Sequence, residues 1–103
     1  MKKNRITVFT PTFNRKDKLK RLYFHLCNQT NLNFVWLIID DGSTDHTKEF
    51  VEEITSKAPF TIKYIWIENH GKQYATNIAI DNTTSDYFAF VDSVDYYLAS
   101  TVT

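Results

Sequence analysis

The stretch that decides the fold is Leu37-Ile38-Ile39-Asp40-Asp41-Gly42-Ser43-Thr44-Asp45. The apolar run from Phe34 to Ile39 predicts a strand that is buried on both faces. Two adjacent carboxylates and a glycine follow it, which predicts a turn. Because ligands bind at the carboxyl ends of the strands in an open parallel sheet, we expect Asp40 and Asp41 on the rim of a crevice.

Strands and helices alternate on both sides of this stretch. Three further short apolar runs predict strands: Ile6 to Thr10, which ends at Pro11, Phe60 to Ile67, and Tyr87 to Val91. Three segments with apolar residues at helical spacing predict helices: one over Leu19 to Cys27, one directly after Ser43-Thr44 that closes at Ala58-Pro59, and one through Ala75 to Asp81-Asn82. This order predicts one α/β domain, an open, mainly parallel sheet with flanking helices that spans residues 1–103 and stops before the domain is complete.

Composition excludes several classes of protein. The chain has 103 residues, of which 43% are hydrophobic, and its 12 basic and 12 acidic residues balance, which argues against a broad nucleic-acid-binding surface. Its two glycines cannot form a dinucleotide fingerprint or a Walker A loop. Cys27 is the only cysteine, so we interpret it as core filler and expect a reducing, cytoplasmic location.

All four predicted strands exit into polar segments that parallel pairing brings to one edge: 11–15, 40–43, 68–72 and 92–95. A ring such as Phe13 offers an apolar face to a nucleotide base, and a carboxylate such as Asp41 can accept the imide N–H of uracil. For Asp40, Ser43 and Asp45 we favour a simpler role, the capping of turns and helices.

Asp92 and Asp95 form the candidate metal site. Two carboxylates suit Mg²⁺ or Mn²⁺, which fill their remaining positions with water and phosphate oxygens. Such an ion would neutralise a diphosphate leaving group. Lys72 and Arg15 could reach phosphates, although each alone is more often an ordinary surface cation. The three histidines lie on different elements and lack zinc spacing.

Four segments, in this order, resemble the nucleotide-binding half of a family 2 glycosyltransferase of the GT-A fold: I-T-V-F-T-P-T-F-N-R (6–15), L-I-I-D-D-G-S-T-D (37–45), N-H-G-K (69–72) with A-T-N (75–77), and F-V-D-S-V-D-Y-Y-L (90–98). The resemblance implies that Pro11, Thr12, Phe13 and Asp41 surround the base, that the Lys72 region approaches the phosphates, and that Asp92 and Asp95 hold ribose and metal. We favour Asp95 for the metal and Asp92 for the ribose. The family usually has an acid where Val94 stands and an arginine where Thr76 stands.

By the same resemblance, the function is metal-assisted, inverting transfer of a sugar from a nucleotide-diphosphate sugar, with UDP as the expected carrier, to a saccharide or lipid-linked acceptor. The acceptor-binding half and the catalytic base are expected outside these residues. Two alternatives remain: a non-catalytic nucleotide-binding or protein-interaction module, and a receiver-like domain, which would need an acidic pair where Pro11 and Thr12 stand. A basic cluster at Lys16, Lys18, Lys20 and Arg21 is more often a solvated helix face, although it could meet phosphates or anionic lipid at the inner face of a membrane. An uncovered sheet face would favour self-association.

Overall fold

The computed structural model describes residues 6–69, 71–81 and 87–91. Its elements, in chain order, are β1 (Ile6–Thr12), α1 (Lys16–Cys27), β2 (Phe34–Asp41), α2 (Thr47–Thr55), β3 (Thr61–Ile67), α3 (Lys72–Asp81) and β4 (Tyr87–Phe90). The strands form one parallel sheet in the order β3-β2-β1-β4. This confirms the predicted open α/β architecture.

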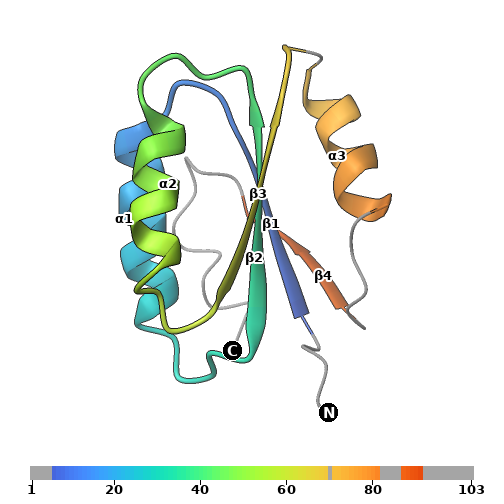
Figure 1. Ribbon diagram of the computed structural model, residues 1–103. Coiled ribbons are helices and arrows are strands. Elements are labelled where there is room, and N and C mark those ends of the chain that lie inside the picture. Colours follow the sequence, from blue (N-terminus) through green and yellow to red (C-terminus); the bar gives the residue numbers. More distant parts are fainter. Residues whose placement is uncertain (1–5, 70, 82–86, 92–103) are drawn as a thin grey trace.

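Helices cover the two faces of the sheet unequally: α1 and α2 pack on one face and α3 on the other (Figure 1). Side chains alternate across the strands, and the larger hydrophobic cluster lies under α1 and α2, with Trp36, Ile38 and Leu22 fully buried. A smaller cluster under α3 contains Phe9, Leu37 and Ala75. Because β2 contributes to both clusters, it is buried on both faces, as the apolar run predicts.

The structure corrects both ends of the second predicted helix. α2 begins at Thr47 rather than directly after Ser43 and Thr44, because those two residues use their backbone N–H groups in loop contacts described below. His46, in the left-handed region with a φ of 67°, then turns the chain into the helix. α2 ends at Thr55, before Ala58-Pro59, and the N–H of Ala58 closes the last turn on the carbonyl of Ile54.

The first strand does not end at Pro11, as the sequence suggested, but continues through it to Thr12. Phe9 directs its carbonyl toward β4, where it accepts the N–H of Val91 at 2.9 Å. Side alternation along a strand therefore points the nitrogen of Pro11 to the same side, beyond the last β1–β4 pair at Phe9 and Phe90. Among the described residues, the missing N–H therefore removes no ladder hydrogen bond.

Two further sequence expectations concern α1 and the membrane. Cys27 is half-buried against the larger cluster, as predicted for core filler. Within residues 6–69, 71–81 and 87–91, every helix is too short or too polar to cross a lipid bilayer.

Candidate functional site

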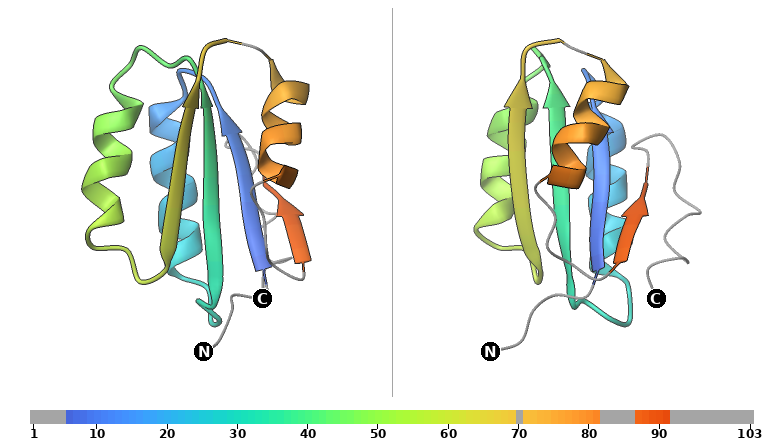
Figure 2. Two further views of the ribbon diagram at one scale, coloured as in Figure 1. Left: turned by 45° about the vertical axis from the view of Figure 1, so that its right-hand side comes forward. Right: turned by 90° about the vertical axis from the view of Figure 1, so that its right-hand side faces the viewer.

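The candidate site lies at the carboxyl edge of the sheet, where the exits of β1 and β2 are clamped together. Figure 2 shows these strand ends along one edge, close to the start of α3. The backbone N–H of Asn14 donates to Ser43 Oγ at 2.8 Å, and the N–H of Thr44 donates to Asn14 Oδ1 at 2.8 Å. Asn14 adopts a left-handed backbone, with a φ of 51°, that makes this reciprocal contact possible. The two exit loops therefore form one unit.

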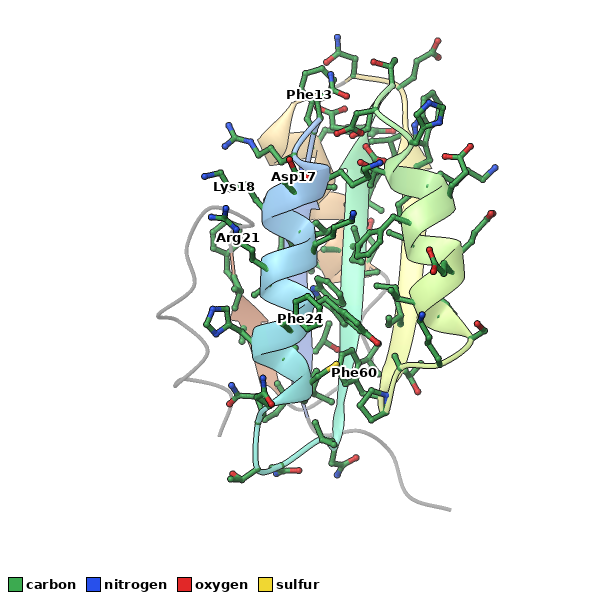
Figure 3. All side chains as sticks on the ribbon, turned by 90° about the vertical axis from the view of Figure 1, so that its left-hand side faces the viewer. Phe13, Asp17, Lys18, Arg21, Phe24 and Phe60 are labelled. Atoms are coloured by element: carbon green, nitrogen blue, oxygen red, sulfur yellow. The ribbon has the colours of Figure 1, made fainter. Side chains whose placement is uncertain are left out.

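Phe13 is carried by this clamp. Its neighbour Asn14 is held by two hydrogen bonds, while the Phe13 ring itself remains 46% exposed. Figure 3 places the ring at the same end of the molecule as the strand exits. An exposed ring on a fixed loop is a surface on which a planar, apolar group can stack.

Asp41, the last residue of β2, connects this unit to the loop before α3. Its Oδ2 atom accepts the backbone N–H of Gly71 at 2.8 Å, and Gly71 immediately precedes the first residue of α3. A carboxylate at the N-terminal end of a helix is stabilised by the helix dipole. Asp41 is half-buried, so the exits of β2 and β3 meet at a carboxylate that remains partly accessible.

Asp40 points to the opposite face and is fully buried. Its Oδ1 atom accepts the N–H of Ser43 at 2.9 Å, and its Oδ2 atom accepts the hydroxyl of Tyr64 on β3. Burial, and then the hydrogen bond and charge of Asp40, raise the pKa of Tyr64 far above its ordinary value. The phenol therefore stays protonated and donates to Asp40. The hydrogen bond from the Ser43 N–H to the same carboxylate confirms the turn-capping role expected for Asp40.

Asp45 joins the first turns of α1 and α2. Its carboxylate accepts the N–H of Lys16 at 3.1 Å and the hydroxyl of Thr47 at 2.5 Å. Burial alone would raise the pKa of Asp45, but the Thr47 hydroxyl and the backbone N–H groups of Lys16, Asp45 and Thr47 outweigh it and lower the pKa. The capping role expected for Asp45 is therefore confirmed, and it extends to the first residue of α1 as well as to that of α2.

The other predicted site residues divide into three groups. Pro11 and Thr12 are buried beside the clamp, and Thr12 Oγ1 has no hydrogen-bond partner among the described residues. Arg15 is exposed and precedes α1. Lys72 begins α3, but the described structure does not include its side chain, and Asp92 and Asp95 lie outside the described residues altogether.

A metal cluster is not seen in the part of the chain that the structure describes, where no three His, Cys, Asp or Glu side chains gather. This leaves the assignment of metal to Asp92 and Asp95 a prediction. The sequence interpretation missed Asn14 and Tyr64 as contributors to the edge. The left-handed preference of asparagine was a usable signal for Asn14, whereas the contact of Tyr64 depends on strand register, which the sequence does not show.

Known proteins share this fold and these segments. The family profile described as "Glycosyl transferase family 2" matches residues 7–102. Glycosyltransferase GlyA of Streptococcus pneumoniae serotype 4 (strain ATCC BAA-334 / TIGR4) is 34% identical over 93 residues, which cover 90% of this chain and 13% of that protein.

Two solved structures are similar over nearly the whole chain. The S. aureus TarS 1-349 structure in complex with UDP superposes with a TM-score of 0.81 at 27% identity, covering 95% of this chain and 31% of the TarS 1-349 chain. The mannosyltransferase PcManGT from Pyrobaculum calidifontis, in complex with GDP-Man and Mn²⁺, has a TM-score of 0.81 at 22% identity, covering 91% and 28%. The chain thus spans a third or less of the length of each of these three proteins.

Proposed function

Because the chain belongs to glycosyl transferase family 2, we propose that it is the nucleotide-sugar-binding part of a glycosyltransferase and that its donor is UDP-linked. TarS, which is 27% identical, binds UDP in its solved structure, and this supports the choice of nucleotide. The short span relative to known members supports the assignment of residues 1–103 to the donor-binding part, with the acceptor-binding half elsewhere in a longer enzyme.

One observation carries the proposal: the clamp between Asn14, Ser43 and Thr44 holds the exits of β1 and β2 together at the carboxyl edge. It keeps the exposed Phe13 ring and the Asp41 carboxylate on the same unit, which is what recognition of a base requires, one apolar face and one directional acceptor. In the proposed complex, Phe13 stacks on uracil and Asp41 accepts its imide N–H. Pro11 and Thr12, which are buried beside the clamp, form the floor.

The phosphates and the metal are assigned to four residues. Arg15 is exposed beside the clamp, Lys72 opens α3, and the donor set for Mn²⁺ or Mg²⁺ is Asp92 with Asp95. Hard carboxylate oxygens suit these ions. Val91, bonded to the Phe9 carbonyl at 2.9 Å, fastens the chain to the sheet immediately before Asp92, so this donor set follows the carboxyl end of a strand. When bound, the ion would stabilise the departing diphosphate.

Transfer would then consist of attack on the sugar by a hydroxyl of a saccharide or lipid-linked acceptor, with inversion. Inverting transfer needs a base within hydrogen-bond reach of that hydroxyl, and no residue of this chain is assigned to that role. The residues on this edge bind and orient the donor. We therefore expect the chain alone to give no acceptor-dependent product with UDP-sugars and Mn²⁺, and glycosylated product from this chain would contradict the assignment to a donor-binding part.

Calorimetric titration of UDP with and without Mn²⁺ tests the proposal, and uridine serves as the phosphate-free control. UDP should bind more tightly with Mn²⁺, because a diphosphate beside two carboxylates is repelled unless a cation lies between them. Asp95→Ala should abolish that gain and leave uridine unaffected, and Asp81→Ala, at the exposed end of α3, is the matched control. UDP affinity that Mn²⁺ does not change would remove the metal assignment, and no UDP binding under either condition would refute the proposed function.

A further inference from the structure

Tyr64 is not among the residues assigned to the nucleotide, yet its hydroxyl contacts Asp40, which supports the loops of that site. It lies in the interior of β3, three residues before the strand ends, and is half-buried. Its hydroxyl donates to Asp40 Oδ2, on the face of the sheet opposite to Asp41. Tyr64 therefore lies beneath the candidate site.

Asp40 needs such a donor. A carboxylate with no exposed surface has lost its hydration and is costly unless hydrogen bonds replace it. The structure provides two donors to its side-chain oxygens, the Tyr64 hydroxyl and the N–H of Ser43. If one of these donors is removed, the Asp40 carboxylate must move to reach water or another donor. Such a movement would also displace the turn that begins at Asp41.

The hydrogen bonds continue from Asp40 into the clamp. Ser43, which donates its N–H to Asp40, accepts the N–H of Asn14 on its hydroxyl at 2.8 Å. Asn14 in turn accepts the N–H of Thr44 at 2.8 Å. One continuous path therefore runs from the phenol on β3, through a buried carboxylate, to the backbone that flanks Phe13.

We infer that Tyr64 is a positioning residue for the nucleotide-base site: through Asp40 and Ser43 it holds the loops that carry Asp41 and Phe13 in the geometry that receives the base. The inference rests on the proposed function and adds to it a residue on β3 that touches no nucleotide. The acids that face the phenol from neighbouring elements are Asp40, Asp45 and Glu49, and all three favour its neutral, donating form.

The test is Tyr64→Phe, which removes one oxygen and keeps the ring. Tyr23→Phe is the matched control, because Tyr23 is also half-buried and packs in the same cluster against Trp36 and Phe60, away from the clamp. Calorimetry with uridine and with UDP plus Mn²⁺ gives two affinities for each protein. We expect Tyr64→Phe to weaken both ligands by about tenfold, the effect of losing one hydrogen bond to a charged group, and to leave the ratio between them unchanged. Tyr23→Phe should leave both affinities unchanged.

The unchanged ratio shows that the phosphate and metal contacts are kept, because only the base site is moved. A thermal melt shows that the variant is folded and so excludes a general loss of structure, which would lower both apparent affinities by the same factor. An amide spectrum adds a second readout: the Ser43 N–H signal should shift in Tyr64→Phe and not in Tyr23→Phe. If Tyr64→Phe does not fold, Ser43→Ala interrupts the same path at a half-buried residue by removing the acceptor of the Asn14 N–H, and should weaken uridine similarly.

The outcomes distinguish this inference from the function on which it rests. Parent protein that binds uridine and UDP, with equal affinities in folded Tyr64→Phe or in Ser43→Ala, would overturn the positioning role and leave the proposed function intact. Parent protein that binds neither ligand would refute the proposed function first, and the positioning role with it.

Discussion

Gly42, directly after Asp41, gives the sharpest prediction about the edge, because a second glycine provides its control. Gly42 has a φ of 91° and Gly71 a φ of 94°, a region that residues with a Cβ rarely adopt. A Cβ at Gly42 would lie 3.3 Å from the backbone nitrogen of Asn69, whereas a Cβ at Gly71 meets nothing within 4 Å among the described residues. Alanine at the two positions therefore carries the same backbone cost and a different contact cost.

The backbone cost is about 1 to 2 kcal/mol for an L-residue in the left-handed region. At Gly42, the backbone of Asn69 must also give way by a few tenths of an ångström, which adds about 1 kcal/mol, the lower end of the range for overpacking. We expect Gly71→Ala to lose about 1 to 2 kcal/mol of unfolding free energy and Gly42→Ala about 2 to 3 kcal/mol. The total stability of a domain is about 5 to 15 kcal/mol, so both variants should fold.

Urea unfolding followed by tryptophan fluorescence measures both values, and an unchanged m-value shows that the same surface is exposed on unfolding. The difference between the two variants isolates the contact with Asn69. A loss in Gly42→Ala that is equal to or smaller than the loss in Gly71→Ala would refute the close approach of the β2 exit to the end of β3.

Three further predictions concern stability. Thr10→Val should lose about 1 to 3 kcal/mol in urea unfolding, because the fully buried Trp36 Nε1–H would lose its acceptor, Thr10 Oγ1 at 2.9 Å, and an unchanged stability would contradict that hydrogen bond. Leu22→Ala should lose about 2 to 5 kcal/mol, whereas Phe24→Ala, two residues on and 65% exposed (Figure 3), should lose less than about 0.5 kcal/mol, and similar losses would show that α1 presents another face to the sheet. Asp45→Asn should destabilise the protein at pH 7, and the difference in unfolding free energy between parent and variant should become smaller in acid. The pKa of Asp45 is lowered in the folded state, so its charge stabilises the fold above the unfolded pKa of about 3.9. This stabilisation is lost as the pH falls through the lower folded value. A difference in unfolding free energy between parent and Asp45→Asn that is the same at pH 7 and pH 3 would contradict the role of the charge.

The sequence predicted the sheet well because its strongest signal was local. Continuous burial of Trp36 to Ile39 required strands on both sides and helices on both faces, and the structure has them. The predicted start of α2 was less accurate, because residues expected to cap the helix form loop contacts instead. Ser43 and Thr44 are good N-cap residues, but they bond across to Asp40 and Asn14, and such tertiary partners cannot be read from one segment.

The pair Asp40-Asp41 shows what was missed at the site. The sequence interpretation ended the strand at Ile39 and placed both carboxylates on the rim. In the structure, β2 continues through Asp41, so strand alternation sends Asp40 into the core beside Tyr64 and Asp41 toward α3. The alternation was visible in principle, but the length of the strand depends on its partners β1 and β3.

Calorimetry with UDP on Asp41→Ala tests whether the Asp41 carboxylate receives the base. Asp81→Ala is the control, because it also removes one acid, at an exposed position away from the clamp. A thermal melt checks that Asp41→Ala remains folded without its hydrogen bond to Gly71. We expect Asp41→Ala to lose about 1.5 to 3 kcal/mol of UDP affinity, or roughly 10- to 150-fold, and Asp81→Ala to bind UDP as the parent does. Equal UDP affinity in the parent and in folded Asp41→Ala would contradict the claim that this carboxylate receives the base.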